Sequence, residues 1–176
     1  MAAPLLSLTE WAVLAALAEL PAHPFAVARL LAEDGALGRV LTVRRPLVYR
    51  AAERLARAGL CCADHTEPGD GGPQRTVYRA TPAVRRALAR WLAEPVAKVR
   101  DLRLEFLLKV RLTRRSGRSP LPLVQAQRAA LGPRLEALAA SRPGADEVLL
   151  WRQHGARAAM EFLEELETGL GDPARG

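Results

Sequence analysis

Residues 44–60 read RRPLVYRAAERLARAGL, and this stretch decides what the rest of the chain can be. Pro46 suits the first turn of a helix and Gly59 suits the residue after its end, so the stretch predicts a helix between them. Apolar residues recur there at intervals of four, four and three, at Leu47, Ala51, Leu55 and Ala58. The residues that fall away from this stripe are Tyr49, Arg50, Glu53 and Arg57, with Arg54 on its flank. We therefore expect a helix with an apolar side and a cationic side.

Two short helices are expected before this stretch. Ser7 and Glu10 have the spacing of a capping box for a helix that runs to about Leu20. Apolar residues surround most of that helix, which indicates a central position. Pro24 suits the first turn of a second helix that ends near Gly35.

A hairpin and one more helix are expected after it. Residues 60–81 contain two strand-like stretches around a loop dense in Gly, Pro and Asp, which predicts a β-hairpin. Thr81 and Pro82 then begin a helix that reaches about Glu94. Three helices, a hairpin and a helix are the order of a winged helix-turn-helix, whose third helix enters the major groove of DNA.

Beyond Pro95 the pattern is helical only, over about residues 99–114, 121–140 and 146–168. Gly132 and Pro133 are expected to kink or split the middle segment. The last segment carries a near-heptad seam that requires a partner helix, formed by Val148, Trp151, Gly155, Ala158, Phe162 and Leu166. The expected fold is mainly α with a small β-hairpin. It comprises an N-terminal winged helix-turn-helix over residues 1–95, a C-terminal helical region over 96–170 and a flexible tail over 171–176.

Charge favours a polyanionic partner. The 176 residues include 26 Lys and Arg against 19 Asp and Glu, a net charge of +7. Six arginines against Glu53 give +5 over residues 39–57, within the element that would meet a duplex. A solvated arginine-rich face remains the alternative interpretation.

Other features bound the compartment and the chemistry. Cys61 and Cys62 are adjacent, which rarely satisfies disulfide geometry, so a reducing compartment fits. No apolar run is long enough to cross a membrane and no secretory signal is recognisable, so we expect a cytoplasmic protein. Catalytic and nucleotide-binding motifs are absent, so we expect neither an enzyme nor a cofactor. The pair Cys61–Cys62 with His65 could form a redox or metal sensor, but no further ligands complete a metal site.

The motifs LVYRAAERLARAGL at 47–60 and GGPQRTVYRATPA at 71–83, with LSLTEWAVLAALAEL upstream, resemble the PadR-type transcriptional regulators. The stretches DLRLEFLLKVRL and VLLWRQHGARAAMEFLEELE resemble the helical dimerisation tail of the longer PadR branch. The resemblance implies a homodimeric DNA-binding regulator, in particular a repressor, on an inverted-repeat operator. It also implies release by a small apolar or aromatic effector. A winged helix used for protein assembly, without DNA binding, is the alternative.

The resemblance and the residue pattern together give candidate sites. DNA binding is expected at Arg44, Arg45, Tyr49, Arg50, Arg54, Arg57 and Arg75. Tyr49 matches the family tyrosine, but Pro46-Leu47 replaces the usual Gly-Thr or Gly-Ser, and Arg75 is the only cation of a wing that usually carries two basic residues. Dimerisation is expected at Phe106, Val110, Val148, Trp151, Gly155, Phe162 and Leu166. Trp91 and Trp151 are candidates for an effector wall, with core packing as the alternative for each.

Overall fold

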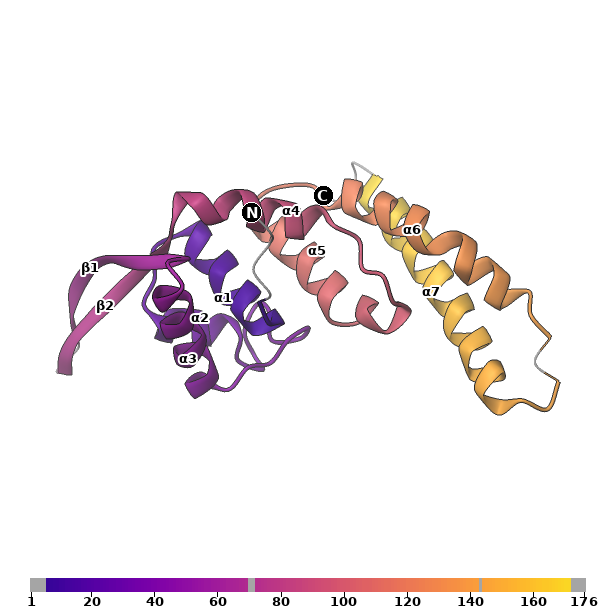
Figure 1. The fold of residues 1–176 in the computed structure, drawn as a ribbon, viewed down its shortest axis with the longest axis horizontal. Coiled ribbons are helices and arrows are strands. Elements are labelled where there is room, and N and C mark those ends of the chain that lie inside the picture. The colour runs from indigo at the N-terminus through magenta and orange to yellow at the C-terminus, as the bar shows by residue number, and fades with distance from the viewer. Residues whose placement is uncertain (1–5, 70–71, 143, 172–176) are drawn as a thin grey trace. The chain divides into compact units, whose positions relative to one another are not determined.

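The computed structural model describes residues 6–69, 72–142 and 144–171. The chain divides into two compact units, Met1–Leu92 and Ala93–Gly176, which we describe separately. In the described residues the fold is mainly helical with one antiparallel hairpin, as the sequence predicts (Figure 1). The expected tail over 171–176 lies, apart from Gly171, outside the described residues.

Helix α1 (Leu8–Glu19) is the centre of the first unit. The predicted capping box is present: the Ser7 hydroxyl accepts from the Glu10 N–H, and the Glu10 carboxylate accepts from the Ser7 N–H. Every residue from Glu10 to Leu17 is buried, which agrees with the central position expected from its apolar composition.

Helix α2 (Pro24–Leu30) ends five residues before the predicted stop at Gly35. The chain turns instead, and the Leu37 N–H donates to the Leu30 carbonyl oxygen at 2.9 Å. Two glycines make this turn possible. A Cβ at Gly35 would lie 2.2 Å from the carbonyl oxygen of Arg29, and a Cβ at Gly38 would lie 1.7 Å from that of Ala32. The close approach of backbone to backbone ends the helix early.

Helix α3 (Arg45–Arg57) has the predicted ends, with Gly59 at φ +67° just beyond it. Its buried face is formed by Val48, Ala51, Ala52 and Leu55. The predicted stripe is therefore wrong in phase: Leu47 is 47% exposed and Ala58 is exposed. The buried face is centred roughly 50° further round the helix, because Val48 and Ala52 pack inward where Leu47 and Ala58 were expected.

The hairpin joins β1 (Cys61–Gly69) to β2 (Gly72–Ala80), with Cys61 opposite Ala80 and Glu67 opposite Arg75. Its base is tied to the turn before α2, because Ala22 and Tyr78 exchange backbone hydrogen bonds of 2.9 and 3.0 Å. Helix α4 (Pro82–Ala93) follows and stacks Trp91 on Trp11 of α1, with ring centroids 4.8 Å apart. The predicted winged helix-turn-helix order is confirmed.

The second unit contains the short 3₁₀ helix η1 (Val99–Leu102) and helices α5 (Glu105–Arg115), α6 (Leu121–Ala139) and α7 (Glu147–Gly171). The predicted segment 99–114 is thus two elements, whereas α6 continues through Pro133 and is not split. Helices α6 and α7 lie side by side (Figure 1). Their shared core also takes in Leu102, Phe106 and Val110.

One buried side chain attaches the start of the second unit to α6. The Gln127 amide accepts from the Val96 N–H at 2.7 Å and donates to the Val96 carbonyl oxygen at 2.9 Å. Gln127 is fully buried, so both its polar atoms need these partners.

Among the described residues, no helix combines the length and apolar character that crossing a bilayer requires.

Candidate nucleic-acid interface

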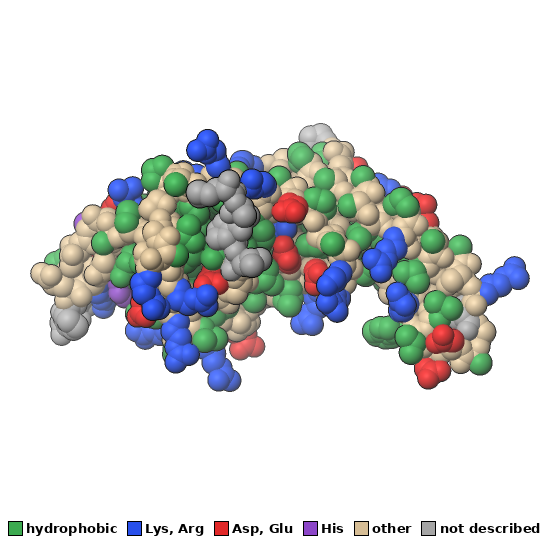
Figure 2. Space-filling view, in the orientation of Figure 1, with side chains coloured by type: hydrophobic (Ala, Val, Ile, Leu, Met, Phe, Trp, Pro, Cys, Tyr) green, Lys and Arg blue, Asp and Glu red, His purple; other side chains and the backbone are tan. Residues whose placement is uncertain are grey.

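The face of α3 opposite its buried side is cationic and open to solvent. At 100° per residue, Arg50, Glu53 and Arg57 lie at its centre, with Arg54 on one flank and Arg45 on the other. All five are exposed, as is Arg44 at the N-cap. Figure 2 shows Lys and Arg side chains gathered over the part of the first unit where Figure 1 places α3. With Tyr49, which is also on α3, six of the seven predicted DNA-binding residues lie on this helix or at its N-cap.

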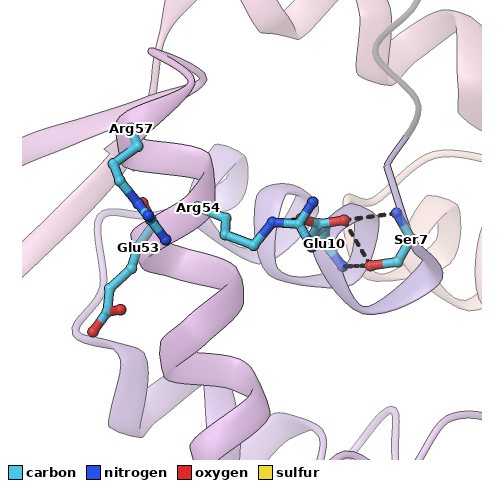
Figure 3. A network of polar contacts seen from close by, with 5 residues as sticks. All are labelled: Ser7, Glu10, Glu53, Arg54 and Arg57. Carbon is cyan, nitrogen blue, oxygen red and sulfur yellow. Dashed lines mark hydrogen bonds and ion pairs between the residues drawn. The ribbon is translucent and has the colours of Figure 1, made fainter.

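Arg54 differs from the other cations because its position is fixed by a buried carboxylate. Its Nε lies 3.3 Å from Oε1 of Glu10, whose side chain is 5% exposed. The other oxygen of Glu10 accepts from the N–H and hydroxyl of Ser7, at 2.8 and 2.7 Å. Figure 3 shows Arg54 reaching from α3 to Glu10 on α1, while Glu53 is directed away. The capping box of α1 therefore also holds the flank of α3.

Arg45, on the opposite flank, is held by aromatic rings. Its guanidinium carbon lies 4.8 Å from the ring centre of Phe25 and 5.5 Å from that of Tyr49. One of its nitrogens donates to the Tyr49 hydroxyl at 3.4 Å. His23 packs its ring against Tyr49 in an edge arrangement, with centroids 5.8 Å apart. Since Phe25 and His23 both belong to the start of α2, this cluster joins α2 to the first turn of α3.

His23 and Phe25 were not identified from the sequence as members of this cluster. The Nδ1 atom of His23 accepts from the Phe25 N–H at 3.2 Å, so this histidine is the N-cap of α2. Burial, followed by the nearby charges of Arg75 and Arg45, lowers the pKa of His23, and Glu67 opposes the shift. A histidine directly before the proline that begins a helix was the available signal, because that position calls for a capping side chain.

The wing carries charges of both signs. Arg75, the predicted wing cation, is half-buried and lies opposite Glu67 in the hairpin. Asp64 pairs with Arg79 at 2.8 Å and contacts Nδ1 of His65 at 3.0 Å. Nε2 of His65 lies 3.1 Å from Glu67. This network links neighbouring side chains along the hairpin.

The predicted dimerisation residues fall into two groups. Phe106 and Val110 lie in the core of a single chain, and Leu166 is half-buried against it. Their apolar surface is therefore largely satisfied within one chain, and sequence periodicity could not distinguish this from a contact with a partner. The others lie on the exposed side of α7, where Val148 is 61% and Trp151 79% exposed and Gly155 is also accessible. Phe162 on the same side is partly exposed, but its ring also packs edge-on against the buried Phe106, with centroids 6.4 Å apart.

The two candidate effector residues also separate. Trp91 is 7% exposed and stacked on Trp11, so its ring is part of the core. Trp151 borders a groove of about 480 Å³ in the second unit, between η1, α6 and α7. Four cations line this groove beside the tryptophan: Lys98, Arg100, Arg134 and Arg152.

The cysteines are both free thiols. Cys61 is buried and its Sγ donates to the Ala52 carbonyl oxygen at 3.7 Å. Burial, and then the neighbouring Cys62, raise the pKa of the Cys61 thiol to about 11. Because the thiolate is the reactive form, Cys61 is poorly suited to thiol chemistry. Within the described residues, no group of three or more His, Cys, Asp or Glu side chains is placed to hold a metal ion.

Comparison with known proteins finds likenesses among solved structures only. No protein-family model matches the sequence, and no curated protein matches it. Among solved structures, the chain is similar to Bacillus subtilis PadR, determined in complex with operator DNA. The two are 17% identical, the likeness covers 90% of this chain and 97% of that chain, and the TM-score is 0.47. The neighbour is of the PadR type that the sequence motifs resemble.

Proposed function

We propose that the protein is a DNA-binding transcriptional regulator, in particular a repressor, that binds an inverted-repeat operator as a homodimer. The observation that carries the proposal is the exposed cationic face of α3 in a winged helix-turn-helix. In this architecture the third helix enters the major groove and the wing lies beside it. Here Val48, Ala52 and Leu55 anchor the helix to the unit, which leaves its arginines facing solvent.

The roles of the arginines differ in this proposal. Arg50 and Arg57, at the centre of the exposed face, contact base edges or phosphates in the groove. Arg44, Arg45 and Arg75 contact the backbone on either side. Arg54 acts mainly by positioning, because its Nε already faces Glu10.

The homodimer is supported by the exposed side of α7. Gln153, Ala156, Ala159 and Leu163 on the other side are buried. Val148, Trp151, Gly155, Ala158 and Phe162 follow heptad spacing on the exposed side. Pairing this seam with the same seam of a second copy would remove Trp151 from water and give the two-fold symmetry that an inverted repeat requires.

The effector part of the proposal rests on Trp151. Its groove offers an aromatic wall with nearby cations, whereas the ring of Trp91 is occupied by its stack on Trp11. A ligand that favours one arrangement of the dimer would change the spacing of the two recognition helices and thereby the affinity for the operator. Such a regulator acts in the cytoplasm and performs no catalysis.

The experiment is a titration of fluorescent random-sequence duplex with the full chain at several salt concentrations. The affinity should fall steeply with salt, and Arg50→Glu and Arg57→Glu should each weaken binding and lower the salt slope. Arg103→Glu is the matched control, because Arg103 is exposed in the second unit and its substitution changes the charge by the same amount. Absence of a salt-dependent interaction would refute the proposal and favour the protein-assembly alternative.

A further inference from the structure

The cluster at the start of α2 and α3 holds a cation in place without a carboxylate. Arg45 lies against the rings of Phe25 and Tyr49 and donates to the Tyr49 hydroxyl. Among the described residues, no acidic side chain pairs with Arg45. A guanidinium fixed by rings loses less side-chain entropy when it binds an anion than a freely moving one. Its planar fork can still donate to two oxygens of a phosphate.

His23 adds a second donor beside this cation. Its Nδ1 accepts the Phe25 N–H, so in the neutral ring the hydrogen is on Nε2. Its ring and the Arg45 guanidinium both contact Tyr49. Burial, and then the charges of Arg75 on β2 and Arg45 on α3, lower the pKa of His23, and Glu67 on β1 opposes this shift. At neutral pH His23 therefore offers a hydrogen-bond donor without a charge.

The position of His23 is fixed relative to the wing as well. The preceding residue, Ala22, exchanges two backbone hydrogen bonds with Tyr78 of β2. His23 thus lies where α2, α3 and the base of the hairpin are all joined.

We infer that His23 and Arg45 together bind one backbone phosphate of the duplex, His23 through its Nε2–H and Arg45 as the cation that Phe25 and Tyr49 hold in place. This inference rests on the proposed function, since it names the DNA group that the site would take. The site sets the register of α3 on the duplex, because phosphate contacts position a protein while base contacts specify sequence.

The test uses the full chain and a duplex that the wild-type protein selects from a random pool. Arg45→Ala should lower the slope of log affinity against log salt by about 0.9. His23→Asn keeps a side-chain oxygen for the N-cap but removes the Nε2 donor, and it should lose affinity about tenfold at an unchanged slope. Phe25→Leu should lose about threefold, also at an unchanged slope, because Arg45 remains but is less restrained.

Two further measurements make the result specific. Neutral methylphosphonate replaces the phosphates of the selected duplex one at a time, and a single position should abolish the effects of both His23→Asn and Arg45→Ala. His154→Asn, an exposed histidine in the second unit, is the matched control and should bind as wild type. Urea unfolding of each variant separates lost affinity from lost folding. If His23→Asn unfolds, His23→Asp replaces it, since aspartate caps a helix well and would repel the phosphate.

The outcomes distinguish this inference from the proposed function. Wild-type protein without salt-dependent binding overturns both. Three outcomes overturn only the shared phosphate site while the wild-type protein still binds DNA. In the first, the His23 variant binds as wild type. In the second, His23→Asn lowers the salt slope as much as Arg45→Ala does, and in the third the effects of the two variants are abolished at two different phosphates.

Discussion

Replacing Glu10 by glutamine tests how the first unit holds α3. Glu10 is almost fully buried and accepts from two groups of Ser7 and from Arg54. Glutamine has the same shape but only one acceptor oxygen, so its NH₂ group must face either the Ser7 donors or the Arg54 donor. A hydrogen bond to a charged group contributes about 1.5–3 kcal/mol. We therefore expect Glu10→Gln to lower the free energy of unfolding by about 2 kcal/mol.

The assay is urea unfolding followed by tryptophan fluorescence. Trp11 and Trp91 are stacked in the core of the first unit, whereas Trp151 is exposed, so the signal reports mainly on the first unit. With a urea dependence of about 2 kcal/mol per molar, the midpoint should fall by about 1 M. Arg54→Ala should lower the free energy of unfolding by less than about 1 kcal/mol, because the Arg54 side chain is 65% exposed.

Glu53→Gln is the matched control, since Glu53 is exposed and directed away from this network (Figure 3). It should leave the midpoint unchanged. In the Arg54→Ala background, Glu10→Gln should be less destabilising than in the wild type, which a double-mutant cycle measures. A midpoint for Glu10→Gln equal to that of Glu53→Gln, or a larger loss for Arg54→Ala than for Glu10→Gln, would refute the reasoning.

Three further predictions concern other parts of the chain. Gly155→Ala should stabilise α7 by about 0.5–1 kcal/mol, because an added Cβ meets nothing within 4 Å in one chain; it should weaken self-association in sedimentation equilibrium, and unchanged association would remove Gly155 from the dimer seam. The hydrogen bonds to Asp64 and then Glu67 raise the pKa of His65, so its NMR titration should have a midpoint above 6.5 that falls in Asp64→Asn. Because the folded pKa is the higher one, this interaction stabilises the hairpin below the unfolded pKa and is lost as pH rises through the folded pKa; a midpoint that Asp64→Asn leaves unchanged would contradict the assignment. Iodoacetamide should label Cys62 before Cys61, whose pKa is raised to about 11, and mass spectrometry that finds the reverse order would contradict the burial argument.

The parts of the fold that could be predicted from the sequence are those set by local chemistry. The Ser7–Glu10 capping box, Pro46 in the first turn of α3 and Gly59 after its end each depend on a few neighbouring residues. The end of α2 depends instead on how closely Gly35 approaches a carbonyl group, which is a tertiary contact that periodicity does not reveal.

The same distinction applies to the candidate site. The arginines of α3 are visible in the sequence as a charged face, but which of them are restrained is not. The contact of Arg54 with Glu10 joins residues 44 positions apart, and the contact of Arg45 with Phe25 joins two helices. Likewise, the apolar character of Phe106 suggests a dimer interface, whereas its neighbours place it in the core of the second unit.

The backbone link between Ala22 and Tyr78 has a mechanical consequence. It couples the base of the hairpin to the residue before the N-cap of α2, so a displacement of the outer hairpin would also move the turn that carries His23. Bending the wing would therefore shift the His23 ring, which packs against Tyr49 in the first turns of the recognition helix.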